Sequence, residues 1–547
     1  MRATYAAASD RRMPPRPIVA KGASIPPPIE GWDAISPVQA MSPKRAIKLD
    51  NWFPQLSWVE LRRGHVRWAT LPGTDAVETV MAYQGAGSES KLFAASLTSI
   101  YDVTDGGIVT VADVTGLTNA RWQHVNFAGT GGDFLYLVNG ADDPQYYDGT
   151  NWNVATITGS GISASDFINV VAHKGRLWFA INNSSSAAYL PSDSVQGAAS
   201  LFPLGGNWTL GGSLTAIGSW SLDGGAGPDD YLAFFSSRGE VSIYSGIDPA
   251  SDFQIVGTYY IGSPIGRRCL TKVGADIAVI CLDGVIPLSK ALVFDRAAVP
   301  RVSLTALIQR VINQAARDFQ DLFGWQLISY PRGNMAILNV PMVENEVQQQ
   351  YVMNTLSGAW CRFIGQNATC WELLNDALYF GGNSGGVFLA DTGPLDDEQS
   401  ITYDMECAFN YFGSPGMQKR WTMCRPLLTT DQQVTPGLAF NVDFQNNAPV
   451  TTPTTVAQPG ALWDQAKWDQ GLWASGIISS SNWTSVSGIG YCASIRMVVN
   501  VEGPGDTGGA LWGYALWGES TWSQQDTAAI TLQVNGFDLL YEKGGFI

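Results

Sequence analysis

The sequence predicts an all-β protein built around a β-propeller, and three observations carry this prediction. An apolar strand start recurs along the chain, most copies are followed by a Gly, Asn or Asp turn and a second strand, and successive copies lie between 42 and 55 residues apart. A period of roughly 40–50 residues with several short strands is typical of propeller blades. The copies begin at Leu92, Leu135, Leu177, Leu232, Ile277, Leu327 and Leu378.

The clearest copy spans residues 134–152, FLYLVNGADDPQYYDGTNW. An apolar run rich in strand formers is broken by Asn139-Gly140, and Tyr146-Tyr147 starts a second strand closed by Asp148-Gly149. One hairpin is not stable alone, so it requires neighbours of its own kind. The spacing allows six to eight blades, and the alternative is an irregular set of hairpins in one or two β-sandwiches.

Composition agrees with an all-β chain of more than one domain. The 547 residues include 59 Gly, 20 Trp and 19 Tyr, and only 15% are charged, which argues against a coiled coil or disorder. No stretch approaches 18 uncharged apolar residues, so we expect no membrane span. The N-terminus lacks the apolar core of a secretory signal.

Changes in pattern divide the chain into three parts. Residues 1–50 are rich in Pro and are expected to form an extended arm, 51–394 the propeller, and 395–547 a separate Trp-rich β-domain resembling a sandwich. Within the propeller, apolar residues at helical spacing predict one amphipathic helix over about 303–321, with Ser303 as its N-cap.

Charge is distributed unevenly between these parts. The whole chain carries −16, but residues 1–50 hold eight basic and four acidic residues, which is +4 and leaves −20 for the rest. An acidic body repels phosphates, so a DNA-gripping role is disfavoured. We expect the arm, through Arg11, Arg12 and Arg16, to dock on a neighbouring subunit; the alternative is a disordered tail.

Two Trp-rich stretches lie in the C-terminal part. Their tryptophans are five residues apart, which fits neither one face of a strand nor a helical face, so tight loops anchored by one Trp each are expected. They form a structural aromatic cluster, a glycan-stacking platform or a subunit interface. The tryptophans are Trp463, Trp468, Trp473, Trp512, Trp517 and Trp522.

The residues needed for catalysis are mostly missing. The three histidines, His65, His124 and His173, have no metal-ligand spacing and no GxSxG partner, and we expect strand residues. The seven cysteines include no CxxC and are expected to be buried thiols. Carboxylates such as Asp142 and Asp148 lie in turns, and the Asp396-Asp397-Glu398 run lacks an EF-type spacing. We therefore expect no enzyme, no metal and no cofactor.

Several stretches resemble the nozzle, or tail tubular protein B-like, components of short-tailed bacteriophages. They are the opening GWDAISPVQAMSPKRAIKLDNWFPQLSWVELRRGHVRWATL, the blade FLYLVNGADDPQYYDGTNW, the helix RVSLTALIQRVI, the last blades YVMNTLSGAWCRF and ALYFGGNSGGVFLAD, and the Trp repeat WDQAKWDQGLW. The resemblance covers most of the chain through short motifs. It implies a propeller that assembles as a ring, commonly a hexamer, below the head-tail connector.

The resemblance also implies a location and partners. The protein would be made in the host cytoplasm and sit in the tail of the virion, against the connector and other tail proteins or fibres. DNA would pass through the channel of the ring without specific binding, and we expect inward-pointing carboxylates there to outnumber Lys and Arg. The alternative is a tail-associated propeller that binds or cleaves glycans, which only the aromatic richness and the Trp repeats favour.

Overall fold

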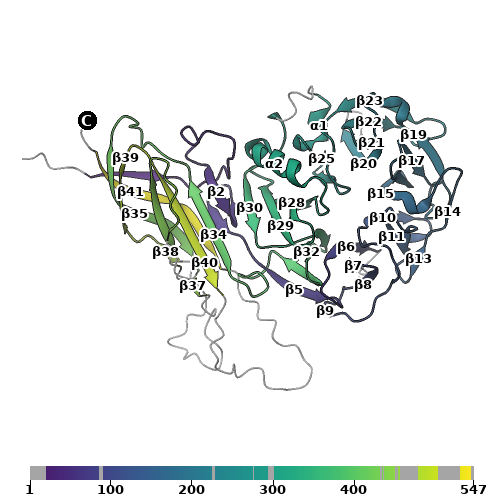
Figure 1. The fold of residues 1–547 in the computed structure, drawn as a ribbon, viewed down its shortest axis with the longest axis horizontal. Helices are drawn as coiled ribbons and strands as arrows, with labels where there is room; N and C mark the ends of the chain where they lie inside the picture. Colours follow the sequence, from purple (N-terminus) through teal and green to yellow (C-terminus); the bar gives the residue numbers. More distant parts are fainter. Residues whose placement is uncertain are drawn as a thin grey trace, which may run out of the picture.

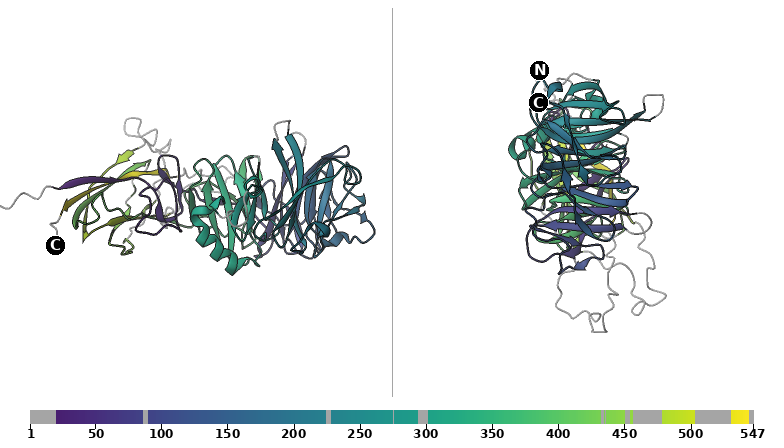
Figure 2. Two further views of the ribbon diagram at one scale, coloured as in Figure 1. Left: turned by 90° about the horizontal axis from the view of Figure 1, so that it is seen from above. Right: turned by 90° about the vertical axis from the view of Figure 1, so that its right-hand side faces the viewer.

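The computed structural model describes residues 20–85, 90–223, 228–274, 276–293, 301–431, 434, 436–449, 454–455, 478–502 and 530–543. They form a ring of small antiparallel sheets beside a β-sandwich (Figure 1). The ring and the sandwich lie end to end along the long axis of the molecule (Figure 2). None of the helices in these ranges has the length and apolar character needed to cross a membrane.

The ring is a β-propeller, and the described residues form seven blades. The first strand of each blade is innermost and packs against the innermost region of the next blade all the way round. Blades 1 to 4 are β6 (Val77–Gln84), β7 (Ser90–Ser96), β8 (Ser99–Asp102); β10 (Gln123–Gly129), β11 (Gly132–Val138), β12 (Gln145–Tyr147), β13 (Trp152–Val154); β15 (Phe167–His173), β16 (Arg176–Ile181), β17 (Ser186–Tyr189), β19 (Ser200–Pro203); and β20 (Leu214–Asp223), β21 (Pro228–Ser236), β22 (Glu240–Ser245), β23 (Gln254–Tyr260).

The remaining three blades complete the circle. They are β24 (Leu270–Val273), β25 (Asp276–Cys281), β26 (Gly284–Pro287); β27 (Gln326–Tyr330), β28 (Met335–Val343), β29 (Val347–Asn354), β30 (Trp360–Ile364); and β31 (Cys370–Leu374), β32 (Ala377–Gly381), β33 (Gly386–Ala390) with β5 (His65–Thr70) and β9 (Gly107–Ile108). A short parallel pair, β14 (Ile157–Thr158) and β18 (Gly197–Ala198), lies outside the blades.

The ring is closed by a strand from its own N-terminal side. β5 pairs antiparallel with β33, so blade 7 combines the beginning and the end of the propeller sequence. β6 of blade 1 also packs on β31 and β32 of blade 7. Leu92 and Leu378 therefore belong to one radial array, as the repeat predicted, and the blade count is seven.

Burial on both faces explains why the blade strands appear as continuous apolar runs. In β11, Leu135, Tyr136, Leu137 and Val138 are all fully buried, because each face of a blade packs against a neighbouring blade. Aromatic rings fill the space between blades. Between blades 3 and 4, Trp178 is stacked on Phe253 and contacts the edge of Phe234.

The recurring strand starts are not all equivalent in the structure. Six of the seven lie in the second strand of a blade, whereas Leu327 lies in β27, the innermost strand of blade 6. The second strand of that blade, β28, is equally apolar and buried. β27 is only partly buried, but its apolar start at Leu327 resembles those of the second strands, so periodicity alone did not distinguish the two.

The predicted helix is present between blades 5 and 6 but begins later than expected. A 3-10 turn, η4 (Ala306–Ile308), leads into α2 (Gln309–Phe319), whose buried side chains include Ile312, Ala315 and Ala316. Ser303 is not the N-cap; its hydroxyl donates to Gln309 Oε1 at 3.0 Å. That bond ties Ser303 to the side chain of Gln309, which explains the later start. A second short helix, α1 (Leu288–Ala291), follows β26.

The C-terminal part is a sandwich of two sheets. One sheet contains β1 (Lys21–Ile25), β3 (Trp52–Pro54), β4 (Val59–Leu61), β35 (Lys419–Thr430), β38 (Ile478–Ser480), β39 (Thr484–Gly490) and β41 (Leu532–Lys543). The facing sheet contains β2 (Ala46–Asp50), β34 (Ile401–Cys407), β36 (Gly437–Val442), β37 (Thr454–Thr455) and β40 (Ala493–Glu502). Trp52, Met405, Trp421, Met497 and Leu539 are buried in its core.

The N-terminal boundary differs from the expected one. Residues 21–25 pair with β41 and residues 46–50 pair with β34, so much of the segment expected to be an arm is part of the sandwich. β3 and β4, expected in the propeller, also belong there, and the propeller begins at β5. Apolar residues such as Ile25, Leu49 and Trp52 complete the sandwich core, which explains why this segment is held.

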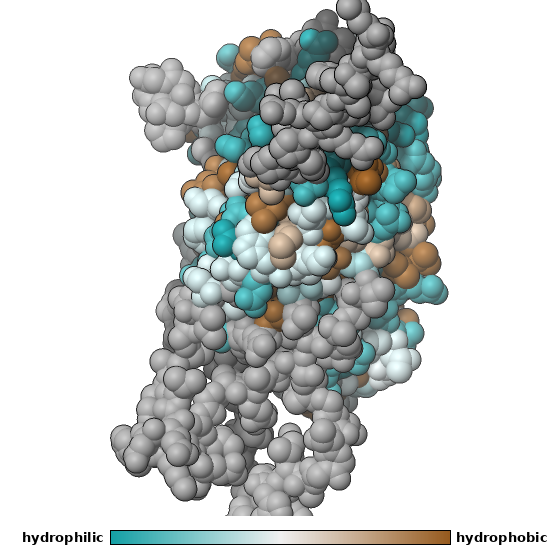
Figure 3. Space-filling model, turned by 90° about the vertical axis from the view of Figure 1, so that its left-hand side faces the viewer, coloured by the Kyte–Doolittle hydropathy of each residue, from teal (hydrophilic) through white to brown (hydrophobic). Residues whose placement is uncertain are grey.

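The end face of the sandwich, away from the propeller, is mixed in character. Hydrophobic residues are scattered there among polar ones in the coloured part of Figure 3. Among the exposed apolar residues of the sandwich are Ile489, Tyr491 and Trp483, and Trp483 is covered in part by the guanidinium of Arg425. This view therefore does not identify one docking patch.

Candidate functional site

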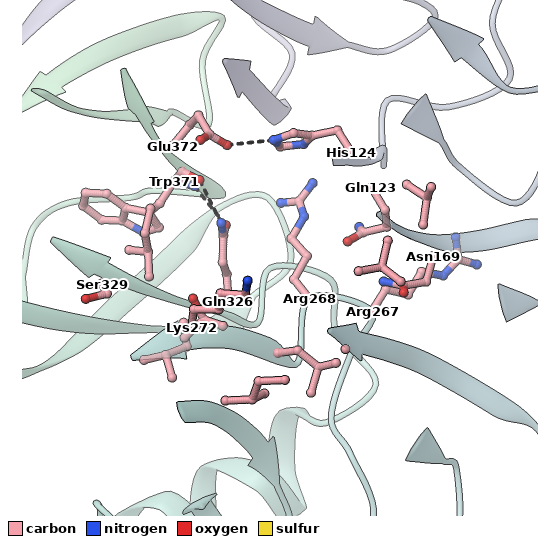
Figure 4. A pocket seen from close by; sticks show the side chains of 18 of the residues that line it. Gln123, His124, Asn169, Arg267, Arg268, Lys272, Gln326, Ser329, Trp371 and Glu372 are labelled. Atoms are coloured by element: carbon pink, nitrogen blue, oxygen red, sulfur yellow. Dashed lines mark hydrogen bonds and ion pairs between the residues drawn. The ribbon is translucent and has the colours of Figure 1, made fainter. Parts of the chain in front are cut away.

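The propeller axis holds a cavity of about 420 Å³ that all seven innermost strands line. Val80, Asn169 and Gly218 come from three of these strands, and Figure 4 shows Gln123, His124, Lys272, Gln326 and Glu372 around the same space. A cavity of this size falls in the range of small-molecule sites. The centre of the propeller is therefore the first place to look for a function.

One end of the axis is bridged by Arg268. Its side chain leaves the loop before β24 in blade 5 and reaches blades 1 and 2 on the opposite side of the ring. There Nη2 donates to Glu78 O at 3.0 Å, Thr79 Oγ1 at 2.7 Å and Trp122 O at 3.2 Å. The guanidinium also lies over the ring of Phe323, 4.9 Å from its centroid. The Arg268 side chain thus links blades on opposite sides of the ring and crosses the central channel of the propeller at this end.

Arg267, which precedes Arg268 in the chain, lies at the same end of the axis. Its Nη1 donates to Asn139 O of blade 2 at 2.7 Å, and no carboxylate of the described residues forms an ion pair with it. Burial, and then the charge of Arg121, lowers the pKa of Arg267. Arg121 by contrast is paired with Glu78 at 3.0 Å and Glu344 at 2.5 Å. Arg267 and Arg268 therefore differ from Arg121, because neither forms an ion pair with a carboxylate of the described residues.

The histidines of the axis are strand residues, as expected. His124 Nε2 lies 2.9 Å from Glu372 Oε2, which joins blades 2 and 7. His173 Nδ1 lies 2.9 Å from Ser219 Oγ, joining blades 3 and 4. Burial, with the charge of Lys174, lowers the pKa of His173 to about 4, so its imidazole is neutral at pH 7. His173 therefore connects neighbouring blades, whereas His124 reaches past blade 1 to a blade that is not adjacent to its own.

Two of the carboxylates considered as catalytic candidates, Asp142 and Asp148, have structural partners. Asp142 accepts hydrogen bonds from the backbone and hydroxyl of Thr118 and from Asn139. Asp148 accepts from the backbone N–H groups of Thr150 and Asn151, which is the expected turn. Within the described ranges no group of three or more His, Cys, Asp or Glu side chains has a metal-binding arrangement. All seven cysteines are buried and unbridged, as predicted.

A second notable region joins the propeller to the sandwich. The sheet of blade 6 continues from β30 into β2 of the sandwich, through the parallel pair Arg362 and Asp50, and then through β34 and β40. Ion pairs follow this order. They are Arg362 Nε to Asp50 Oδ1 at 2.8 Å, Lys48 to Asp404 at 2.5 Å and Arg496 to Asp404 at 2.6 Å.

A buried cluster lies beside this sheet, where β5 leaves the sandwich. Arg62 donates to Asp396 Oδ1 at 2.8 Å and to Asn51 Oδ1 at 2.8 Å, and His65 Nδ1 lies 3.0 Å from the same carboxylate. Burial would raise the pKa of Asp396, but Arg62 and His65 outweigh it and lower this pKa to about 2. Asp396 is thus an ion-pair residue, while its neighbour Asp397 pairs with Arg67 at 2.7 Å.

The assembly residues proposed from the sequence lie outside the described residues. They are Arg11, Arg12, Arg16, Trp463, Trp468 and Trp473, and the second set of tryptophans lies outside as well. The axial arginines were not anticipated from the sequence. The available signal was Arg267-Arg268, two adjacent cations after Gly266 in a chain with few charges.

Comparison with known proteins adds only distant structural similarity. No family model and no curated protein matches this chain. Among solved structures, BBS1N, crystallised in complex with ARL6DN, is 10% identical and covers 62% of this chain and 99% of its own, with a TM-score of 0.38. YCF48 bound to D1 peptide is 10% identical, covers 62% and 96%, and has a TM-score of 0.35. Both are β-propellers, and the similarity extends to the fold alone.

Proposed function

We propose that this protein is a non-enzymatic virion protein that forms the ring-shaped tail nozzle of a short-tailed bacteriophage. The observation that carries the proposal is the placement of the resembling stretches. FLYLVNGADDPQYYDGTNW spans β11 to β13, YVMNTLSGAWCRF spans β29 to β30, and ALYFGGNSGGVFLAD spans β32 to β33. Each motif spans a turn of a blade with residues of the strands on both sides, which is how a shared fold would preserve it.

Two further stretches support the same assignment. RVSLTALIQRVI leads through η4 into α2 after the last strand of blade 5, where the resemblance implies a helix after a mid-propeller strand. The opening stretch, residues 31–71, contains β2 to β5, which run from the sandwich into the closing strand of the propeller. These are architectural elements that connect the sandwich and the blades.

The linked architecture suits a static subunit. The sheet shared by blade 6 and the sandwich, with its ion pairs, restrains the two parts from moving as separate bodies. The bridged axis has a second consequence. DNA in such a nozzle passes between subunits, through the channel of the ring, because Arg268 crosses the axis of each propeller.

Negative-stain microscopy of the purified protein tests the proposal. We expect rings with a central channel, alone or after addition of the head-tail connector. Monomers or trimers with affinity for glycans would contradict it and favour the glycan-binding or glycan-cleaving alternative. Reconstruction of the ring then tests whether inward-pointing carboxylates outnumber Lys and Arg.

The N-terminal residues offer a sharper assembly test. Residues 1–19 carry four arginines and one aspartate, whereas β1 begins at Lys21, so deletion of 1–19 preserves every described strand. We expect the truncated protein to fold normally and to assemble poorly, with the loss of assembly mimicked by high salt in the full chain. A matched variant with Arg11, Arg12 and Arg16 changed to Gln separates charge from length. Normal rings from both variants would refute a role for these residues.

A further inference from the structure

Charge in the axial cavity is opposite in sign to that of the protein as a whole. Among the described residues that line it, Arg267, Arg268 and Lys272 stand against one carboxylate, Glu372, which lies 2.9 Å from His124 Nε2. The chain overall has 48 acidic and 32 basic residues. The cationic lining is therefore a local feature of the innermost strands and the loop before β24.

The arginines of this cavity are largely desolvated and form no ion pair with a carboxylate of the described residues. Arg268 donates through Nη2 to three oxygen atoms, all of them neutral, and its Nη1 is buried without a hydrogen-bond acceptor. Burial lowers the pKa of Arg268, and the nearby Cys370, Glu78 and Glu372 offset this only in part. Removing a guanidinium from water without a counter-charge is unfavourable, so a bound anion would stabilise this arrangement.

The cavity also offers a route and polar neighbours for such a ligand. Lys272 is exposed and has no ion pair with any described carboxylate, so the cavity meets solvent at its level. Arg268 also lines the cavity, and Gln326 lies between Lys272 and Arg268 (Figure 4). Cations at these two positions suit a compact ligand with oxygen acceptors, while the amide of Gln326 is held by the backbone of Trp371.

We propose that the axial cavity binds a small molecule bearing phosphate or carboxylate groups, with Arg267, Arg268 and Lys272 supplying the positive charge. Guanidinium groups recognise oxyanions through charge-assisted hydrogen bonds, and lysine adds a mobile ammonium at the exposed end. The cavity volume of about 420 Å³ accommodates a metabolite-sized anion. The site is independent of ring formation, since one propeller contains all of it.

Isothermal titration calorimetry at constant ionic strength tests this, with inorganic phosphate and citrate as separate probes and chloride as the reference. We expect saturable binding of at least one probe, and at least about tenfold weaker binding in both Arg267→Gln and Lys272→Gln. Binding of phosphate alone assigns the phosphate class, and binding of citrate alone the carboxylate class. Lys272→Gln guards against misfolding, because Lys272 is exposed and its side chain makes no hydrogen bond or ion pair within the described part of the chain.

Arg238→Gln is the matched control. It removes the same charge from the same protein, but Arg238 is exposed and does not line the cavity. Its affinity for the probes is expected to equal that of the unmodified protein. Equal weakening in Arg238→Gln would reduce the effect to general electrostatics and overturn the proposal. The absence of saturable binding by both probes would overturn it directly.

Discussion

Buried or half-buried arginines occur in two regions of this protein, and only one region pairs them with carboxylates. At the junction of propeller and sandwich, Arg62 is paired with Asp396 and Arg362 with Asp50. At the propeller axis, Arg267 and Arg268 donate to neutral acceptors, mainly backbone carbonyls. Burying a charge is tolerated most easily when it is paired, so the junction is built for stability and the axis has unused capacity to hold an anion.

The largest expected effect comes from breaking the junction. Arg62→Met leaves Asp396 buried without its guanidinium, which typically costs about 3–5 kcal/mol of folding free energy. Denaturant unfolding followed by tryptophan fluorescence measures the loss. The control Arg67→Met removes a partly exposed partner of Asp397, for which about 1 kcal/mol or less is expected. Similar losses for the two variants would contradict the importance of burial here.

Acid should weaken the same junction. The pKa of Asp396 is about 2 in the fold, below the ordinary 3.8, so its pairing stabilises the protein fully above about pH 4. That contribution, on the order of 2 kcal/mol, is lost as the pH falls from about 4 to about 2, because the unfolded chain takes up the proton first. Unfolding measured across this range in Asp396→Asn should show a shallower dependence on pH. An unchanged slope would show that Asp396 is not the group responsible.

Breaking the axis should cost less than breaking the junction. Arg268→Met removes hydrogen bonds to Glu78 O, Thr79 Oγ1 and Trp122 O but leaves no carboxylate without its charge partner. A loss of about 1–2 kcal/mol is expected, since relief of the desolvated guanidinium offsets part of the lost bonding. The comparison with Arg62→Met uses the same substitution at both sites. A loss of folding free energy as large as that of Arg62→Met would mean that the hydrogen bonds of Arg268 across the axis are themselves essential for the fold.

The blades could be predicted from the sequence because their physical cause is local and repeated. Runs such as Leu135–Val138 are apolar throughout because both faces of a blade are buried, and Asp148-Gly149 marks its turn through bonds to the next two or three residues. The closing strand β5 was not predictable in this way. It pairs with β33, more than 300 residues away, and no local pattern encodes that partner.

The candidate site was less predictable than the fold for the same reason. The cationic cavity depends on Arg268 meeting Thr79 and Trp122 across the ring, which only the seven-blade closure arranges. Likewise Asp396 looked like part of an acidic run, and its burial against Arg62 and His65 is visible only in three dimensions. Asp396 and Asp397 are adjacent in the chain but differ in burial and in their ion-pair partners. The sequence alone does not predict this difference.

The smallest expected effect concerns DNA, which we expect neither region to hold. The chain carries −16, the guanidinium of Arg268 is tied across the axis, and Arg267 is half-buried, so these two axial arginines do not form an exposed row of cations for phosphates. Titration of duplex DNA at low salt should show weak binding that disappears on deletion of residues 1–19, which contain Arg11, Arg12 and Arg16.

Arg267→Gln should leave that weak binding unchanged, because a duplex is far too wide to enter a cavity of about 420 Å³. Tight binding by the truncated protein would contradict passage of DNA without retention, and its loss in Arg267→Gln would place DNA at the propeller axis after all.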